Sequence, residues 1–145
     1  MERRYFVMLI LLAGLALPMS ALAADQEIAR EDQAAITEAV QSQLIAVAND
    51  DADAAFALAT ADTRSRMGDA NTFLQLIKQQ YAPLYRHQRA IFSTPEMIHG
   101  ETIQSVRLTD SDNSVWVALY QMQQEPDGKW RIAGCTLLET TTVSV

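Results

Sequence analysis

The side chain with the most obvious potential for chemistry is Cys135, the only cysteine of this 145-residue chain, within the stretch PDGKWRIAGCTLLE. A reactive thiolate needs a histidine, a cation or a helix N-terminus beside it. The flanking residues Gly134, Thr136 and Leu137 supply none of these, and Arg131 is four positions away. We therefore predict a core or pocket-wall cysteine, with catalysis, redox chemistry and an intermolecular disulfide as the alternatives.

Gly134 decides which face of the last strand carries this thiol. If Trp130 and Ile132 are core anchors on the covered face, strict alternation puts Cys135 on the opposite face. A glycine inside a strand often marks a bulge, and a bulge here would invert that register. The sequence is compatible with both registers.

The two histidines, His87 and His99, flank a short strand candidate. Across a hairpin they would come together and bind a metal with a carboxylate such as Glu101. A zinc site needs a third protein ligand, however, and the chain has no CxxC or HExxH spacing. We predict two surface histidines at strand ends, no metal and no cofactor.

The stretch YAPLYRHQR combines two tyrosines, a proline and two arginines. In one interpretation Tyr81, Tyr85 and Arg86 line the mouth of a cavity and hold an anionic or polar ligand. In the other, Tyr81 completes a helix stripe, Tyr85 packs under the sheet edge and Arg86 binds helix C-terminal carbonyls. The candidate ligand-binding residues are Tyr81, Tyr85, Arg86, Trp116 and Tyr120.

An isomerase-like enzyme would need a carboxylate inside the fold, with a tyrosine and an acid as oxyanion donors. The acidic residues cluster in predicted helices and turns, and only Glu101 and Glu139 fall in predicted strands. Neither a GxSxG motif nor a glycine-rich phosphate loop is present. We assign no catalytic residue and predict a non-catalytic module that binds a small ligand or a protein partner. A small isomerase- or hydrolase-like enzyme with an unidentified acid or base is the alternative.

The elements that position these residues fall into two halves, helical from Asp25 to Tyr85 and strand-like from about Arg86. In the first half Ile36, Val40, Leu44 and Val47 recur at helical spacing and form one apolar stripe, which Ile28 extends.

Three further helical segments are expected before the strands begin. We expect Asp50 to cap the second, Asp62 a short third, and Asn71 or Asp69 the fourth, which Pro83 prevents from continuing.

The second half predicts a curved antiparallel sheet of about four strands, covered on one face by the helices. Short turns at DSDN and EPDG separate the strands, and Pro95 and Gly100 bracket an earlier break. The strand SVWVALYQMQ is apolar on both faces, which predicts burial on both sides. We therefore expect the second face to be covered by a partner subunit, in a homodimer through the sheet face, or by an extra segment.

The first residues have the layout of a secretory signal peptide: two arginines, the apolar run YFVMLILLAGLALPM and the cleavage pattern ALAA. We predict a signal peptide over residues 1–23 and a single domain over residues 24–145. We expect export by the general secretory route to the periplasm, with full secretion as the alternative. No stable membrane anchor is expected after cleavage.

The chain is acidic, with a net charge of −7 that becomes −8 once Glu2, Arg3 and Arg4 leave with the signal peptide. Such a surface repels phosphates, so we expect no nucleic-acid partner. The predicted partners are an unknown small ligand or another exported protein.

The stretches MGDANTFLQLIKQQYAPLYR, VWVALYQM and DGKWRIAGCTLLE resemble a family of exported bacterial proteins known as domain of unknown function 4864. The most specific parts of that likeness are YAPLYR and DGKWRIAGC. The family in turn resembles the cystatin-like superfamily, which includes nuclear transport factor 2 and ketosteroid isomerase. The resemblance implies a cone-shaped α+β domain with helices packed on a curved sheet, and it implies no assigned activity.

Overall fold

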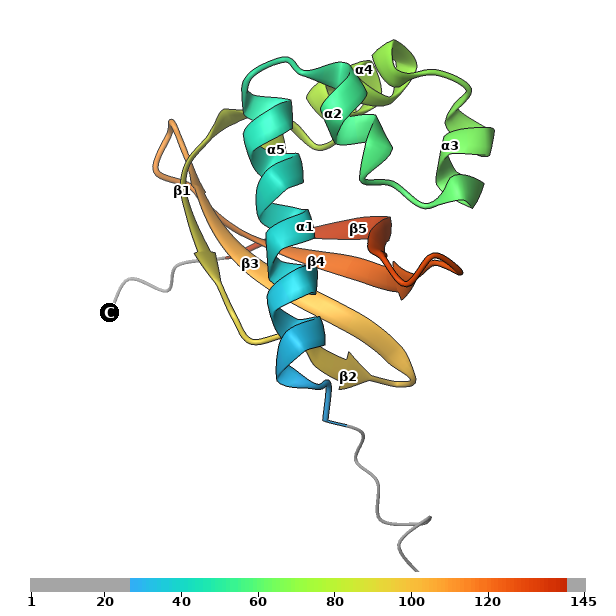
Figure 1. Ribbon diagram of the computed structural model, residues 1–145. Helices are drawn as coiled ribbons and strands as arrows, with labels where there is room; N and C mark the ends of the chain where they lie inside the picture. The colour runs from blue at the N-terminus through green and yellow to red at the C-terminus, as the bar shows by residue number, and fades with distance from the viewer. Residues whose placement is uncertain (1–26, 141–145) are drawn as a thin grey trace, which may run out of the picture.

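A computed structural model describes residues 27–140, which form helices followed by an antiparallel sheet. Figure 1 shows the long first helix crossing one face of the sheet, with the shorter helices gathered at one end. The helices are α1 (Arg30–Ala48), α2 (Ala52–Ala57), α3 (Ala61–Met67), α4 (Ala70–Gln80) and α5 (Ala82–Arg86). The strands are β1 (His87–Phe92), β2 (Glu96–Ile98), β3 (Glu101–Asp110), β4 (Val115–Gln124) and β5 (Trp130–Glu139). The predicted α+β class is confirmed.

The predicted signal peptide, residues 1–23, lies outside the described residues. Within residues 27–140, no helix has the length and apolarity required to cross a bilayer.

The sheet has the order β1-β3-β4-β5, and β2 pairs with the same edge of β3 as β1 does. The described residues thus form five strands where the sequence predicts about four. The additional strand β2 lies inside the break expected between Pro95 and Gly100. His99 (φ 50°) and Gly100 (φ 79°) both adopt left-handed backbone, as a two-residue hairpin turn requires, and so join β2 directly to β3.

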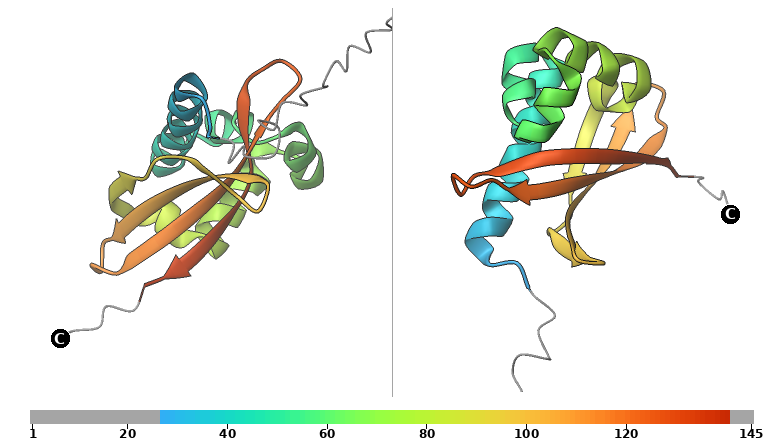
Figure 2. Two further views of the ribbon diagram at one scale, coloured as in Figure 1. Left: turned by 90° about the horizontal axis from the view of Figure 1, so that it is seen from below. Right: turned by 90° about the vertical axis from the view of Figure 1, so that its right-hand side faces the viewer.

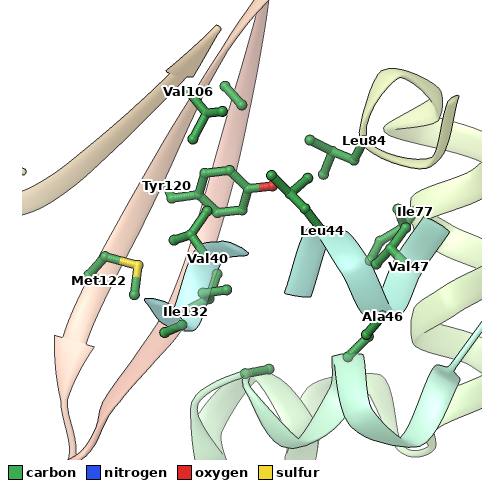
Figure 3. Close-up of a cluster of buried hydrophobic side chains, with 14 of the residues drawn as sticks. Val40, Leu44, Ala46, Val47, Ile77, Leu84, Val106, Tyr120, Met122 and Ile132 are labelled. Carbon is green, nitrogen blue, oxygen red and sulfur yellow. The ribbon is translucent and has the colours of Figure 1, made fainter. Parts of the chain in front are cut away.

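The core lies between α1 and the concave face of the sheet, which the two views of Figure 2 show to be twisted and bent around the helices. The predicted stripe of α1 is buried at Ile36, Val40, Leu44 and Val47, and Ile28 packs against it partly buried. Figure 3 shows Val40 and Leu44 of this stripe beside Tyr120 of β4, and Val47 beside Ile77 of α4. The strand residues of the core are Val106, Leu108, Ala118, Tyr120, Met122 and Ile132.

The helix starts differ from the predictions at two of three positions. Asp51, not Asp50, caps α2 by accepting a hydrogen bond from the Ala54 amide at 3.1 Å. Asp50 instead has a positive φ of 57°, which directs its carboxylate toward Lys78.

Thr60, not Asp62, caps α3 through its hydroxyl oxygen. A threonine in the extended backbone conformation can serve as well as an aspartate there. The prediction that Asp69 caps α4 is confirmed, since its carboxylate accepts from the Thr72 amide at 2.7 Å. Hydrogen bonds from the Thr72 amide and hydroxyl lower the pKa of Asp69.

Candidate ligand-binding pocket

A β-bulge at Ala133, one residue before Gly134, changes which face of β5 the following side chains occupy. Gln121 pairs with Gly134 and Met122 with Ile132, so Ala133 has no partner on β4. Beyond the bulge Cys135 pairs with Tyr120, whose side chain is fully buried under the helices. Ile132 and Cys135 therefore share the helix-covered face, and strict alternation does not hold.

The close approach of Gln121 explains the glycine at this position. A Cβ added to Gly134 would lie 2.6 Å from the Gln121 Oε1 atom, well inside van der Waals contact. The bulged strand thus needs a residue without a side chain beside Gln121.

Cys135 is a free, partly buried thiol that packs against the core. Burial raises its pKa to about 12, so that the thiol is neutral near pH 7. The prediction of a core or pocket-wall cysteine agrees with this environment, because no cation holds the thiolate form.

A pocket of about 180 Å³ opens beside Cys135, between α3, α4 and β5. We call it the side pocket. Its apolar wall comes from both helices and from the bulged part of the strand, and its polar groups are few. The lining residues are Gln43, Ala59, Thr63, Arg66, Met67, Phe73, Leu76, Ile77, Tyr81, Leu84, Ile132, Ala133, Gly134 and Cys135.

The bulge also anchors α3, which forms one wall of the side pocket. The Thr60 amide donates to the Ile132 carbonyl at 3.0 Å, and the Ile132 amide donates to the Leu58 carbonyl at 2.8 Å. The Thr63 hydroxyl then donates to the carbonyl of Ala133 at 3.2 Å. The polar atoms of this wall are therefore already paired within the protein.

Gln43 is the exception among the buried polar groups of the side pocket. It lies on α1 between the stripe residues Val40 and Val47, and only 3% of its surface is exposed. Within residues 27–140 its amide makes no hydrogen bond to another residue. The amide is not sealed from solvent: among the described residues the fully enclosed polar side-chain group without a partner is the Tyr120 hydroxyl, whereas the Gln43 amide opens into the pocket that it lines. The sequence analysis overlooked this residue. Its position three residues after Val40 and four before Val47 placed it on the buried face.

The proposed binding residues do not form one site. Tyr81 lines the side pocket. Tyr120 lies deeper in the core, and Figure 3 shows its hydroxyl directed away from the sheet toward the helical side chains. That hydroxyl is buried without a hydrogen-bond partner in the described part of the chain. Burial raises the pKa of Tyr120 well above its usual value, and the nearby Cys135 adds to the effect.

Tyr85 takes part in a surface cluster instead. Its hydroxyl donates to Asp50 Oδ2 at 3.2 Å, and the Lys78 ammonium lies 4.7 Å from its ring centre. Lys78 also forms an ion pair with Asp50. The hydrogen bond from Lys78 lowers the pKa of Asp50, and the same contact raises the pKa of Lys78. This cluster ties α4 and α5 to the end of α1.

Arg86 and Trp116 line a separate, more polar cleft with Asp110, between α5 and the β3–β4 turn. The Trp116 indole N–H donates to Asp110 Oδ2 at 3.0 Å. The sequence thus grouped side chains that the fold distributes over the side pocket, the core, a surface cluster and this second cleft.

The histidines lie at opposite ends of the sheet. His87 begins β1 opposite Asp110, and its Nδ1–H donates to the Leu84 carbonyl at 2.8 Å. His99 stands in the turn before Glu101, at the other end of β3. The hairpin that would have brought them together for a metal site does not form, and residues 27–140 contain no cluster of three or more metal-binding side chains.

The fold and its pocket define a small α+β domain in which helices cover one face of an antiparallel sheet and enclose an apolar pocket at its side. The chain belongs to the family described as Domain of unknown function (DUF4864), which matches residues 29–145. This confirms the resemblance to that family seen in the sequence. No curated protein and no solved structure matches the chain.

Proposed function

We propose that this domain binds a small, largely apolar molecule in the side pocket. The observation that carries the proposal is an apolar pocket in which a buried polar side chain, Gln43, has no partner among the described residues. Ligand pockets in proteins combine apolar walls with a few convergent polar groups in this way.

The size of the pocket limits the ligand. A dry apolar cavity of ~150 Å³ is known to accept benzene. The side pocket, at about 180 Å³, suits one ring or a short branched chain. It is smaller than the ~300–1,000 Å³ that drug-sized ligands occupy.

The composition of the pocket favours binding over the alternative of an enzyme. Among residues 27–140 no aspartate or glutamate lines it, so this part of the chain places no carboxylate as a general base beside Tyr81. Cys135 is a neutral thiol and a poor nucleophile.

Toluene is a suitable probe of this proposal. Titrated into ¹⁵N-labelled protein, it should shift the backbone amide signals of Gly134 and Cys135, which line the pocket. Leu76→Trp places a large ring into the pocket from α4 and should abolish these shifts.

Gln75→Trp is the matched control, since Gln75 precedes Leu76 on α4 but is exposed and does not line the pocket. It should bind toluene like the unaltered protein. The proposal fails if toluene leaves these signals unmoved, or if the Leu76→Trp protein responds as strongly as the control.

We also propose that the open face of the sheet associates with a second copy of the chain. Val117 and Leu119 lie in the middle of this face, opposite the helices. Two flanking side chains on the same face, Ile91 and Leu138, are 55% and 49% exposed. Exposed apolar groups gathered on one sheet face are typical of interaction surfaces.

A further inference from the structure

Two buried glutamines of the described residues, Gln43 at the side pocket and Gln104 in the core, differ in their hydrogen bonds. Gln104, on β3, is fully buried and satisfied: it accepts from the Thr37 hydroxyl at 2.8 Å. Its NH₂ group donates to the carbonyls of Ser93 and Ser105 at 2.7 and 2.9 Å. Gln43 is nearly as buried and makes no such bonds within residues 27–140.

The Gln43 amide faces the pocket and not a sealed interior, so water in the pocket can pair with it. Once a ligand displaces that water, an amide left without a partner is costly, and an apolar side chain at the same position would avoid that cost. A helix stripe otherwise built from Val40, Leu44 and Val47 would accept a leucine or methionine at position 43. A ligand group that forms hydrogen bonds with the Gln43 amide would explain why this position carries a polar side chain.

Among the described lining residues, the pocket interior offers no partner for a charged ligand. Arg66 is the only charged side chain of that lining, and it lies at the rim, with 65% of its side chain exposed and an ion pair to Asp62 at 3.2 Å. The other polar side-chain groups of the lining are the Gln43 amide, the paired Thr63 hydroxyl, the Tyr81 hydroxyl and the Cys135 thiol. A carboxylate or ammonium placed there would lose its hydration without gaining a counter-ion.

From this geometry we infer that the ligand of the side pocket is an uncharged molecule with about six to ten non-hydrogen atoms, whose single carbonyl or amide group pairs with Gln43. A primary or secondary amide matches best, because it donates and accepts at the same time, as the side chain of Gln43 does. This inference rests on the proposed function and specifies the chemistry of the same site.

Three monosubstituted benzenes separate the possibilities: toluene, and the isosteric pair benzamide and benzoate. In amide-detected titrations, benzamide should bind about tenfold more tightly than toluene, the effect of one or two neutral hydrogen bonds. Benzoate should bind more weakly than benzamide. Gln43→Leu should remove the preference for benzamide over toluene while leaving toluene bound.

Gln41→Leu is the matched control, because it makes the same substitution on the exposed side of α1, away from the side pocket. It should preserve the preference for benzamide. If the Gln43→Leu protein does not fold, Gln43→Met, which keeps the length of the side chain, takes its place.

Each remaining outcome contradicts the inference in a distinguishable way. Toluene and benzamide binding equally, with no effect of Gln43→Leu, overturns the inference and leaves the proposed function standing. Benzoate binding most tightly, with that binding lost in Arg66→Gln, overturns it in favour of an anionic ligand held at the rim. Binding of none of the three compounds overturns the proposed function and the inference together.

Discussion

At the scale of single residues, two groups beneath the helices, the Cys135 thiol and the Tyr120 hydroxyl, are neutral. Cys135 is held as a thiol, and the Tyr120 hydroxyl is buried without a partner in the described residues. An unpaired buried hydroxyl costs roughly 1–3 kcal/mol. The surrounding apolar packing therefore offsets a local defect in the core.

The thiol of Cys135 should be unreactive in the folded protein. Because burial raises its pKa to about 12, the thiolate fraction at pH 8 is on the order of a thousandfold below that of an exposed cysteine. We expect alkylation by iodoacetamide in native conditions to accelerate about tenfold per pH unit between pH 8 and 10. Mass spectrometry of the quenched protein measures the rate.

The urea-unfolded protein provides the control, because its thiol has an ordinary pKa and its alkylation rate should level off above about pH 9. A native rate that levels off at the same pH would show that Cys135 titrates as an exposed thiol.

The chemistry of individual residues was only partly predictable from the sequence. The absence of a cation near Cys135 along the chain indicated an inert thiol. The face that carries it could not be predicted, because the bulge at Ala133 arises from pairing with Gln121 and Met122 on another strand. Gln43 was overlooked because a polar residue within a helix is usually assigned to the solvent side.

At the scale of elements, α3 depends on a small set of polar contacts. The Thr60 hydroxyl accepts from the Thr63 amide at 3.2 Å and donates to the Thr63 hydroxyl at 3.0 Å. Both residues are buried, so the Thr63 amide and the two hydroxyls cannot form hydrogen bonds with water instead. The helix has seven residues and is too short to be stable alone.

Thr60→Val should therefore destabilise the domain by about 1–2 kcal/mol, since it keeps the shape of the side chain but removes the cap oxygen. Urea unfolding followed by circular dichroism measures the change. Because α3 forms a wall of the side pocket, the affinity for toluene should fall as well.

Thr60→Ser retains the cap oxygen and should lose less stability than Thr60→Val. If the valine variant unfolds at the same urea concentration as the serine variant, the hydroxyl does not hold α3 in place.

The long, periodic elements were the predictable ones. The stripe of α1 and the alternation in β3 are dictated by burial along many residues. β2 was missed because three exposed residues carry no alternation, and its pairing depends on the turn at His99 and Gly100. The cap of α2 was placed one residue early because adjacent aspartates compete, and the backbone conformation decides between them.

At the scale of the whole molecule, the two faces of the sheet differ in what covers them. One face meets the helices. On the other, a single row crosses the sheet through Ile91, Arg107, Val117 and Leu138, as the strand pairings show. Glu101 lies on the same face of β3, six residues from Arg107. A row of three apolar side chains and one arginine, with a glutamate further along the same face of β3, suits a second copy of the chain.

Two-fold symmetry makes this arrangement self-complementary. An axis lying between two such faces and crossing the middle of β3 would stack Arg107 of one copy on Glu101 of the other. A stable interface of this kind buries about 800 Å² on each copy. The four strands of the open face provide the surface on which such contact would occur.

We expect sedimentation velocity to show a dimer at micromolar concentrations that Leu138→Asp converts to a monomer, because a buried carboxylate would face apolar side chains. Ile45→Asp is the matched control: Ile45 is an equally exposed apolar residue, but it lies on α1, and its replacement should leave the dimer intact. Arg107→Glu should weaken association, and the added change Glu101→Arg should restore it. A monomer at 100 µM in the unaltered protein would contradict the proposed dimer. If the protein is a dimer and neither Leu138→Asp nor Arg107→Glu weakens it, the interface lies elsewhere on the surface.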